Sequence, residues 1–205
     1  MKKSVPLPRT LQEFLQSEYL TPKTSEVLTE RLHRNFEKPL YFTAAEFTLL
    51  GTVCQLLMGE ETDLYNNKMA GHIDERLAQG KSDGWRYDEM PPDGEMYRLG
   101  LEAINGSGRL LYNADFLNLN TAAQTEVLTE IQNGTAPGEI WKDLSPTLFF
   151  EELLAEIAET YYSFPEIQIE IGYAGMADRF GWEKPEMGTV EPAERAIVSL
   201  KEIQP

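Results

Sequence analysis

Hydrophobic residues recur every three or four positions through most of this chain, which is the spacing of one face of an α-helix. Leu28, Leu32 and Phe36 lie four apart and form one such stripe. The run FTAAEFTLLGTVCQLLMGE is apolar on two faces, which is typical of a helix at the centre of a core. Thr43 followed three residues later by Glu46 predicts a capping box at the start of that helix.

The clearest predicted helix runs from Ser145 to Tyr162, where Ser145 suits the N-cap and Pro146 suits the first helical position. Its apolar face consists of Phe150, Leu153, Leu154, Ile157, Ala158 and Tyr161. Four acidic residues are expected to form its solvated face: Glu151, Glu152, Glu156 and Glu159. Pro165 is expected to stop the helix.

Shorter helices are predicted at several other places along the chain. They cover residues 10–19, 71–78, 93–105 (ending at Asn105-Gly106), 121–133 and the C-terminal PAERAIVSLKEI. The stretches QGKSDGWRYDEMPPDGE and GSGRLLYNADFLNLN are expected to be loops, the second with extended pieces. Strand signals are few, and IQIEIGY is the best of them because its isoleucines alternate. The pattern therefore predicts an all-α fold, an irregular helical bundle of about seven helices with long loops.

The length of 205 residues suits one domain with appendages. We expect an N-terminal helical extension over residues 1–41 and a helical domain over residues 42–182. Residues 183–205 are expected to form a linker and a short C-terminal helix.

The net charge of −16, from 34 acidic and 18 basic residues, excludes a nucleic-acid-binding role and an anionic membrane surface as partner. The single cysteine, Cys54, lies in an apolar run and is expected to be buried. The sequence shows no secretory signal and no run long enough for direct membrane insertion. The chain is therefore expected in the cytoplasm, and in the periplasm only if it is exported with a partner.

Candidate chemistry is sparse. The two histidines, His33 and His72, have no set of converging ligands at metal-binding spacing. Glycines 172, 175 and 181 do not fit the dinucleotide fingerprint, which needs a strand–turn–helix setting. No nucleophile elbow or phosphate-binding loop occurs either. The sequence thus predicts no catalytic residue, no metal site and no cofactor-binding residue in this chain.

A stand-alone small-ligand-binding domain remains an alternative. It would need a pocket with converging polar groups, and the best candidates are Asp74, Arg76, Trp85 and Tyr87. Aromatic residues in loops are equally consistent with a protein interface, where Trp and Tyr are enriched.

Several segments, in order, resemble the gluconate 2-dehydrogenase subunit 3 family over residues 42–182. They are FTAAEFTLLGTVCQLLM, HIDERL, YRLGLEAIN, FLNLNTAAQTEVLTEIQNG, Trp141, FFEELL and IGYAG. The resemblance implies a non-catalytic accessory subunit that supports the maturation or stability of a large subunit. That partner would be a glucose-methanol-choline type dehydrogenase, and FAD would be bound in the partner. Many members carry a twin-arginine signal and a Gly-Gly-Asn stretch after the proline, whereas this sequence has no twin arginine and reads EIQIE after Pro165.

The segment IGYAGMADRFGW is interpreted as a glycine-shaped docking loop. Gly172 and Gly175 would allow turns with positive φ, and the other contacts would come from aromatic side chains and an arginine. The predicted partner-binding residues are Gly172, Tyr173, Gly175, Arg179, Phe180 and Trp182. A cytoplasmic protein–protein adaptor that keeps the fold and binds a different partner is the second alternative.

Overall fold

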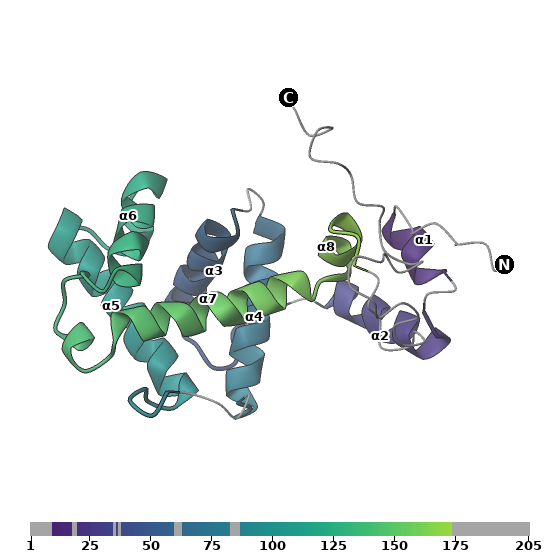
Figure 1. Ribbon diagram of the computed structural model, residues 1–205, viewed down its shortest axis with the longest axis horizontal. Helices are drawn as coiled ribbons and strands as arrows, with labels where there is room; N and C mark the ends of the chain where they lie inside the picture. The colour runs from purple at the N-terminus through teal and green to yellow at the C-terminus, as the bar shows by residue number, and fades with distance from the viewer. Residues whose placement is uncertain are drawn as a thin grey trace, which may run out of the picture. The chain divides into compact units, whose positions relative to one another are not determined.

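A computed structural model describes residues 10–17, 20–34, 36, 38–59, 63–82 and 87–173. These residues form eight α-helices and two short 3-10 helices, with no strand among them (Figure 1). The α-helices are α1 (Leu11–Leu15), α2 (Pro22–His33), α3 (Ala44–Met58), α4 (Asp63–Ala78), α5 (Asp93–Tyr112), α6 (Thr121–Gln132), α7 (Pro146–Tyr162) and α8 (Pro165–Glu170). The 3-10 helices are η1 (Phe116–Asn118) and η2 (Ile140–Lys142). The predicted all-α fold class is confirmed.

The chain divides into two compact units. One is Asn35–Tyr161, which holds α3 to α6 and nearly all of α7. The other combines Met1–Arg34 with Tyr162–Pro205, and its described helices are α1, α2 and α8. The three domains expected from the sequence stay a prediction, since their last boundary lies outside the described residues.

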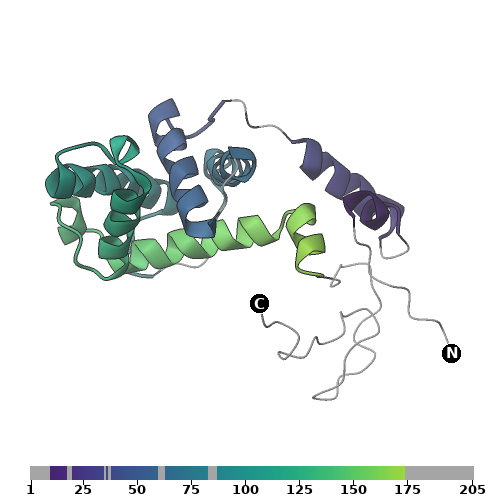
Figure 2. The ribbon, with the colours of Figure 1, turned by 90° about the horizontal axis from the view of Figure 1, so that it is seen from above.

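Helix α3 is the central helix of the larger unit. Its predicted capping box is confirmed: the Thr43 side chain accepts from the backbone N–H of Glu46, whose carboxylate accepts from the Thr43 N–H. Both bonds satisfy donors that a helix start leaves unpaired. The buried residues of α3 are Leu49, Leu50, Gly51, Val53 and Cys54. Helix α3 packs along α4, and α7 runs past α4, α3 and α5 in both views (Figure 1 and Figure 2).

Helix α4 begins earlier than predicted, at Asp63 rather than at residue 71. Gly71 resembled a helix start but lies inside the helix. A Cβ placed on Gly71 would come 2.1 Å from Cγ of Phe36. The glycine therefore serves close packing, because only the absence of a side chain lets the Phe36 ring approach the helix.

Helix α5 is longer than predicted. The sequence favoured an end at Asn105-Gly106, but the helix continues to Tyr112 and ends at Asn113, whose φ of 56° lies in the left-handed region. Asn105 does not end the helix; its side-chain oxygen accepts a hydrogen bond of 3.1 Å from the backbone N–H of Phe116. The segment predicted to be loop with extended pieces is thus half helix, followed by the short η1.

Two other predicted helices are confirmed, those over residues 121–133 and 145–162. Helix α6 is capped by Asn120, which accepts from the N–H of Ala123, and α7 begins at Pro146. The ring of Phe149 on α7 packs so closely on α5 that a Cβ on Gly100 would lie 2.0 Å from it. This contact joins the two longest helices of the described chain.

A buried hydrogen-bond chain holds the segment between α6 and α7 on α5. Trp141 is 8% exposed, and its indole N–H donates to Oγ of Ser107 over 2.9 Å. Ser107 in turn donates to the carbonyl oxygen of Pro137 over 2.8 Å. Each polar atom in this chain has a partner, so burying the indole leaves no unpaired donor.

The strand signal in IQIEIGY is wrong, because residues Pro165–Glu170 form helix α8. Pro165 occupies the first turn, where its missing N–H costs nothing. Ile167 is buried, and Ile169 packs against the core of Phe14, Leu20 and Leu28. Burial against α1 and α2 therefore overrides the alternating pattern, which is a weak signal in so short a segment.

Candidate partner-binding surface

The C-terminal end of α8 is closed by Gly172. The N–H of Gly172 donates to the carbonyl of Ile169 over 3.0 Å, and the N–H of Tyr173 donates to that of Gln168 over 2.7 Å. With a φ of 72° at Gly172, this is a Schellman motif, the usual glycine-dependent helix end. The expected positive φ at Gly172 is confirmed, and its physical cause is helix termination.

Two large side chains flank this glycine and are open to solvent. Ile171 is 53% exposed and Tyr173 is 47% exposed. Of the six predicted partner-binding residues, Gly172 and Tyr173 are therefore described, and Tyr173 has the exposure that docking requires. The other four lie outside the described residues: Gly175, Arg179, Phe180 and Trp182. Their role in binding stays a prediction.

Asp74 on α4 holds the chain segment that leads into α3. Its Oδ2 accepts from the N–H of Leu40 over 2.6 Å, and its Oδ1 accepts from Tyr41 over 3.0 Å and Phe42 over 2.8 Å. The side chain is almost fully buried, with 2% exposed. A carboxylate that accepts three backbone hydrogen bonds has its hydrogen-bonding capacity satisfied. Asp74 therefore has a structural role, holding the segment before α3 on α4.

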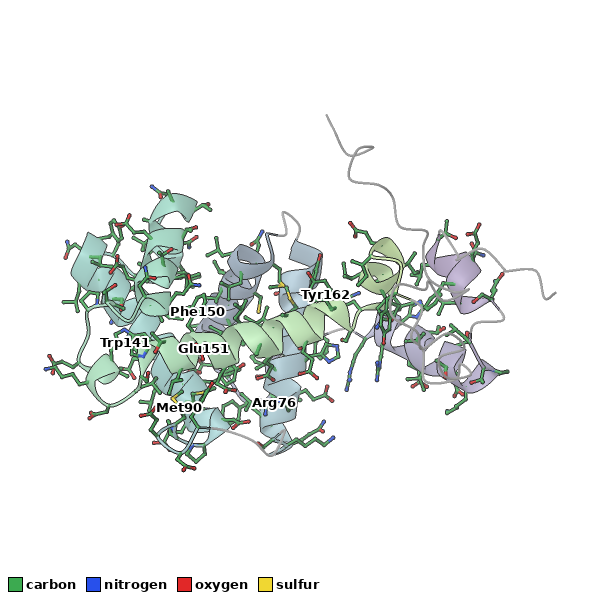
Figure 3. The ribbon with its side chains drawn as sticks, in the orientation of Figure 1. Arg76, Met90, Trp141, Phe150, Glu151 and Tyr162 are labelled. Atoms are coloured by element: carbon green, nitrogen blue, oxygen red, sulfur yellow. The ribbon has the colours of Figure 1, made fainter. Side chains whose placement is uncertain are left out.

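A second polar cluster joins α4, α5 and α7 around Glu156. Arg76 binds the Glu156 carboxylate through two bonds, from Nε over 2.5 Å and from Nη2 over 2.7 Å, and reaches Asp93 over 2.6 Å. The hydroxyl of Tyr97 donates to the same carboxylate over 2.6 Å. Figure 3 labels Arg76 on α4, beside the ribbon of α7. This bidentate geometry is the strongest form of an arginine–carboxylate pair.

The cluster shifts the pKa of its members in ways that fix their protonation. Burial, and then the charge and the hydrogen bond of Glu156, raise the pKa of Tyr97 well above its ordinary value. Burial alone would lower the pKa of Arg76, but the bonds to Glu156 and Asp93 outweigh it and raise that pKa. The pKa of Cys54 is raised too, first by burial and then by Glu156. At neutral pH the thiol and the phenol are protonated and Arg76 is charged.

The described residues that were proposed to line a small-ligand pocket form hydrogen bonds with different groups. Asp74 is bonded to the segment before α3, Arg76 to Glu156 and Asp93, and Tyr87 to Glu151 over 3.3 Å. Trp85 lies outside the described residues. The expectation that Glu156 belongs to the solvated face of α7 is wrong, because its side chain is only 21% exposed and is paired. Sequence spacing could not reveal this, since Arg76 lies 80 residues away.

An apolar surface missed by the sequence analysis lies at the C-terminal end of α5. Leu110 is 65% exposed, Leu111 41%, Tyr112 36% and, in η1, Leu117 38%. We call these four residues the α5 tip. Leu110 and Leu111 follow the buried Ala103 and Ile104 by seven positions, a spacing that places them on the same face of α5. They are exposed because this part of the helix extends beyond the core. That spacing was the available signal, and it was lost because the helix was expected to end at Gly106.

The two histidines each contact a neighbouring group of the protein. His33 Nδ1 lies 2.8 Å from the carbonyl of Thr29, and His72 packs edge-on against Phe36. Among the residues that the structure describes, no three His, Cys, Asp or Glu side chains are grouped so that they could hold a metal ion. Within the same residues, no helix combines the length and the apolarity needed to cross a membrane.

These features define a helical protein whose described polar clusters serve its own packing and whose exposed apolar residues lie mainly at helix ends. The family model for gluconate 2-dehydrogenase subunit 3 matches residues 44–176, which is more than half of the chain. The chain belongs to this family of accessory subunits of dehydrogenase complexes. Searches among curated proteins and solved structures gave no significant match.

Proposed function

We propose that this chain is a non-catalytic accessory subunit that binds a glucose-methanol-choline type flavoprotein dehydrogenase and supports its maturation or stability. The observation that carries the proposal is the family match over residues 44–176. Sugar or alcohol oxidation would take place in the large subunit, which would bind the FAD. This chain would contribute surface and stability to the complex.

The hydrogen bonds that the polar residues of this chain form with one another support a non-catalytic role for it, with catalysis in the large subunit. Arg76, Asp93, Tyr97 and Glu156 are bonded to one another, and Asp74 is bonded to backbone N–H groups. Groups that satisfy each other in this way stabilise the fold, and drawing them onto a substrate would leave a partly buried charge unpaired. The described surface is mostly polar and charged, and it also exposes eight large apolar side chains that would offer contact area to a partner.

The experiment is a pull-down of the tagged full-length chain from its native host under gentle lysis. Bound proteins are identified by mass spectrometry, and the eluate is scanned for flavin absorbance. We expect one stoichiometric large flavoprotein and a yellow eluate. The identity of that protein would also name the reaction and its substrate.

Two other results would each replace the proposal by a named alternative. A colourless eluate with a different stoichiometric protein would identify an adaptor, which the EIQIE sequence after Pro165 favours because it departs from the family pattern. A monomer that releases a small molecule on denaturation would identify a ligand-binding domain.

A further inference from the structure

We infer that the α5 tip is a second docking surface for the large dehydrogenase subunit and that it takes an apolar patch rimmed by Lys and Arg on that partner. This inference rests on the proposed function. The surface consists of Leu110, Leu111, Tyr112 and Leu117.

The exposure of the α5 tip is concentrated in one short stretch. In the unit Asn35–Tyr161, the exposed large hydrophobic residues described are Leu40 and the four tip residues. The four lie within eight consecutive positions, while Leu40 stands alone before α3. Single exposed apolar residues are common on protein surfaces, whereas a group of them marks an interaction site.

Local structure holds the tip in place, so docking would require little ordering. Gly108 lets the returning chain approach α5, since a Cβ there would lie 3.2 Å from the carbonyl oxygen of Ala114. Asn105 fixes the N–H of Phe116, a fully buried residue next to Leu117. A preformed surface loses less conformational entropy on binding than a flexible one.

The charges around the tip select the kind of partner. Glu126 accepts a hydrogen bond from Tyr112, and Glu130 acts on the same hydroxyl through its charge, so the adjoining face of α6 is acidic. Arg109 is neutralised by Asp115, with Nε and Oδ1 2.5 Å apart. The charged side chains at the edge of the tip, which form its rim, are therefore negative overall, and the whole chain carries a net charge of −16. A second copy would repel this rim, as would an anionic membrane, whereas a basic rim would complement it.

The test compares a tip variant with a matched surface variant. Leu110→Gln with Leu117→Gln removes apolar area at the tip, and Leu40→Gln removes a side chain of similar exposure, 70% against 65% for Leu110, away from it. All three proteins are checked for unchanged helicity and melting temperature. The probe is the flavoprotein captured by the wild-type chain, purified and titrated against each variant.

We expect the tip variant to bind that flavoprotein about tenfold or more weakly, and Leu40→Gln to bind like the wild type. Glu126→Gln with Glu130→Gln is expected to slow association and flatten its dependence on salt. Equal binding by the wild type and the tip variant would overturn this inference and leave the proposed function standing. A wild-type chain that captures no flavoprotein would overturn both. A dimer of this chain that the tip variant breaks would show a second copy to be the occupant and overturn the inference.

Discussion

Glu156 uses both carboxylate oxygens to connect α7 with Arg76 on α4 and Tyr97 on α5. Replacing it by alanine would leave the Tyr97 hydroxyl buried without an acceptor, and Arg76 would keep Asp93 as its one carboxylate partner and the carbonyl oxygen of Lys81. We expect Glu156→Ala to lower the free energy of unfolding by about 2–3 kcal/mol. This loss is smaller than that for breaking a fully buried ion pair, because the site is partly exposed.

Glu159→Ala is the matched control, since Glu159 is an exposed acid on the same helix and should change stability by less than about 0.5 kcal/mol. Urea denaturation followed by circular dichroism measures both variants. Equal losses from the two substitutions would show that the cluster around Glu156 contributes nothing specific.

The raised pKa of Tyr97 predicts a loss of stability in alkali. Burial and Glu156 keep the phenol protonated when folded, while the unfolded phenol ionises near pH 10. The unfolded state then binds fewer protons than the folded state, so the free energy of unfolding falls as pH rises above about 10. The contribution of Tyr97 is complete below that pH and is lost by at most about 1.4 kcal/mol per pH unit above it.

Unfolding of the wild type and Tyr97→Phe between pH 8 and pH 11 provides the measurement. Phenylalanine cannot ionise, so the variant should be less stable at pH 8, where it lacks the bond to Glu156, and show a shallower alkaline slope. Parallel slopes would contradict the assignment to Tyr97. Cys54, whose pKa is also raised, contributes in the same direction in both proteins.

At the scale of the element, two glycines of α5 predict opposite effects of the same substitution. A Cβ on Gly100 would lie 2.0 Å from the Phe149 ring, whereas a Cβ on Gly106 would meet nothing within 4 Å. Gly100→Ala should destabilise by about 1–3 kcal/mol through overpacking. Gly106→Ala should stabilise by about 0.5–1 kcal/mol, because alanine favours a helix interior.

Thermal melting of the two variants beside the wild type separates these effects. The melting temperature should fall for Gly100→Ala and rise for Gly106→Ala. A rise in both would mean that helix propensity, rather than contact with α7, dominates at these positions, and a fall in both would contradict the open space beside Gly106.

The elements that the sequence predicted well are those with strong local signals. Thr43 and Pro146 mark helix starts through their own chemistry, so α3 and α7 begin where expected. The misread elements depend on distant partners. Gly71 and Gly106 looked like boundaries because a glycine that ends a helix and a glycine inside one are identical in sequence.

The same limit applied to the candidate site. The positive φ of Gly172 followed from its residue type, but Asp74, Arg76 and Glu156 found partners through tertiary packing. The α5 tip was hidden for a related reason, since its exposure depends on where the core ends along α5. The sequence pattern identifies which residues are apolar, whereas tertiary packing determines which of them remain exposed to solvent.

At the scale of the whole molecule, the predicted docking segment can be tested against the complex. Tyr173→Ala with Trp182→Ala should weaken capture of the flavoprotein by about tenfold while leaving the helicity unchanged. Tyr162→Ala is the control, because Tyr162 is 51% exposed and was not assigned to the segment. Unchanged co-purification of the double variant would remove this segment from the interface.

The packing of Ile169 against Phe14, Leu20 and Leu28 has a consequence for how the protein is made. Helices α1 and α2 leave the ribosome first, yet the helix that completes their core is among the last described parts to emerge. Until then, they lack the apolar contact that α8 supplies. The larger unit can close on itself in that interval, so its folding would precede that of the unit built from the two ends. An expressed fragment that starts at the family boundary, residue 44, would lack both N-terminal helices and leave Ile169 uncovered.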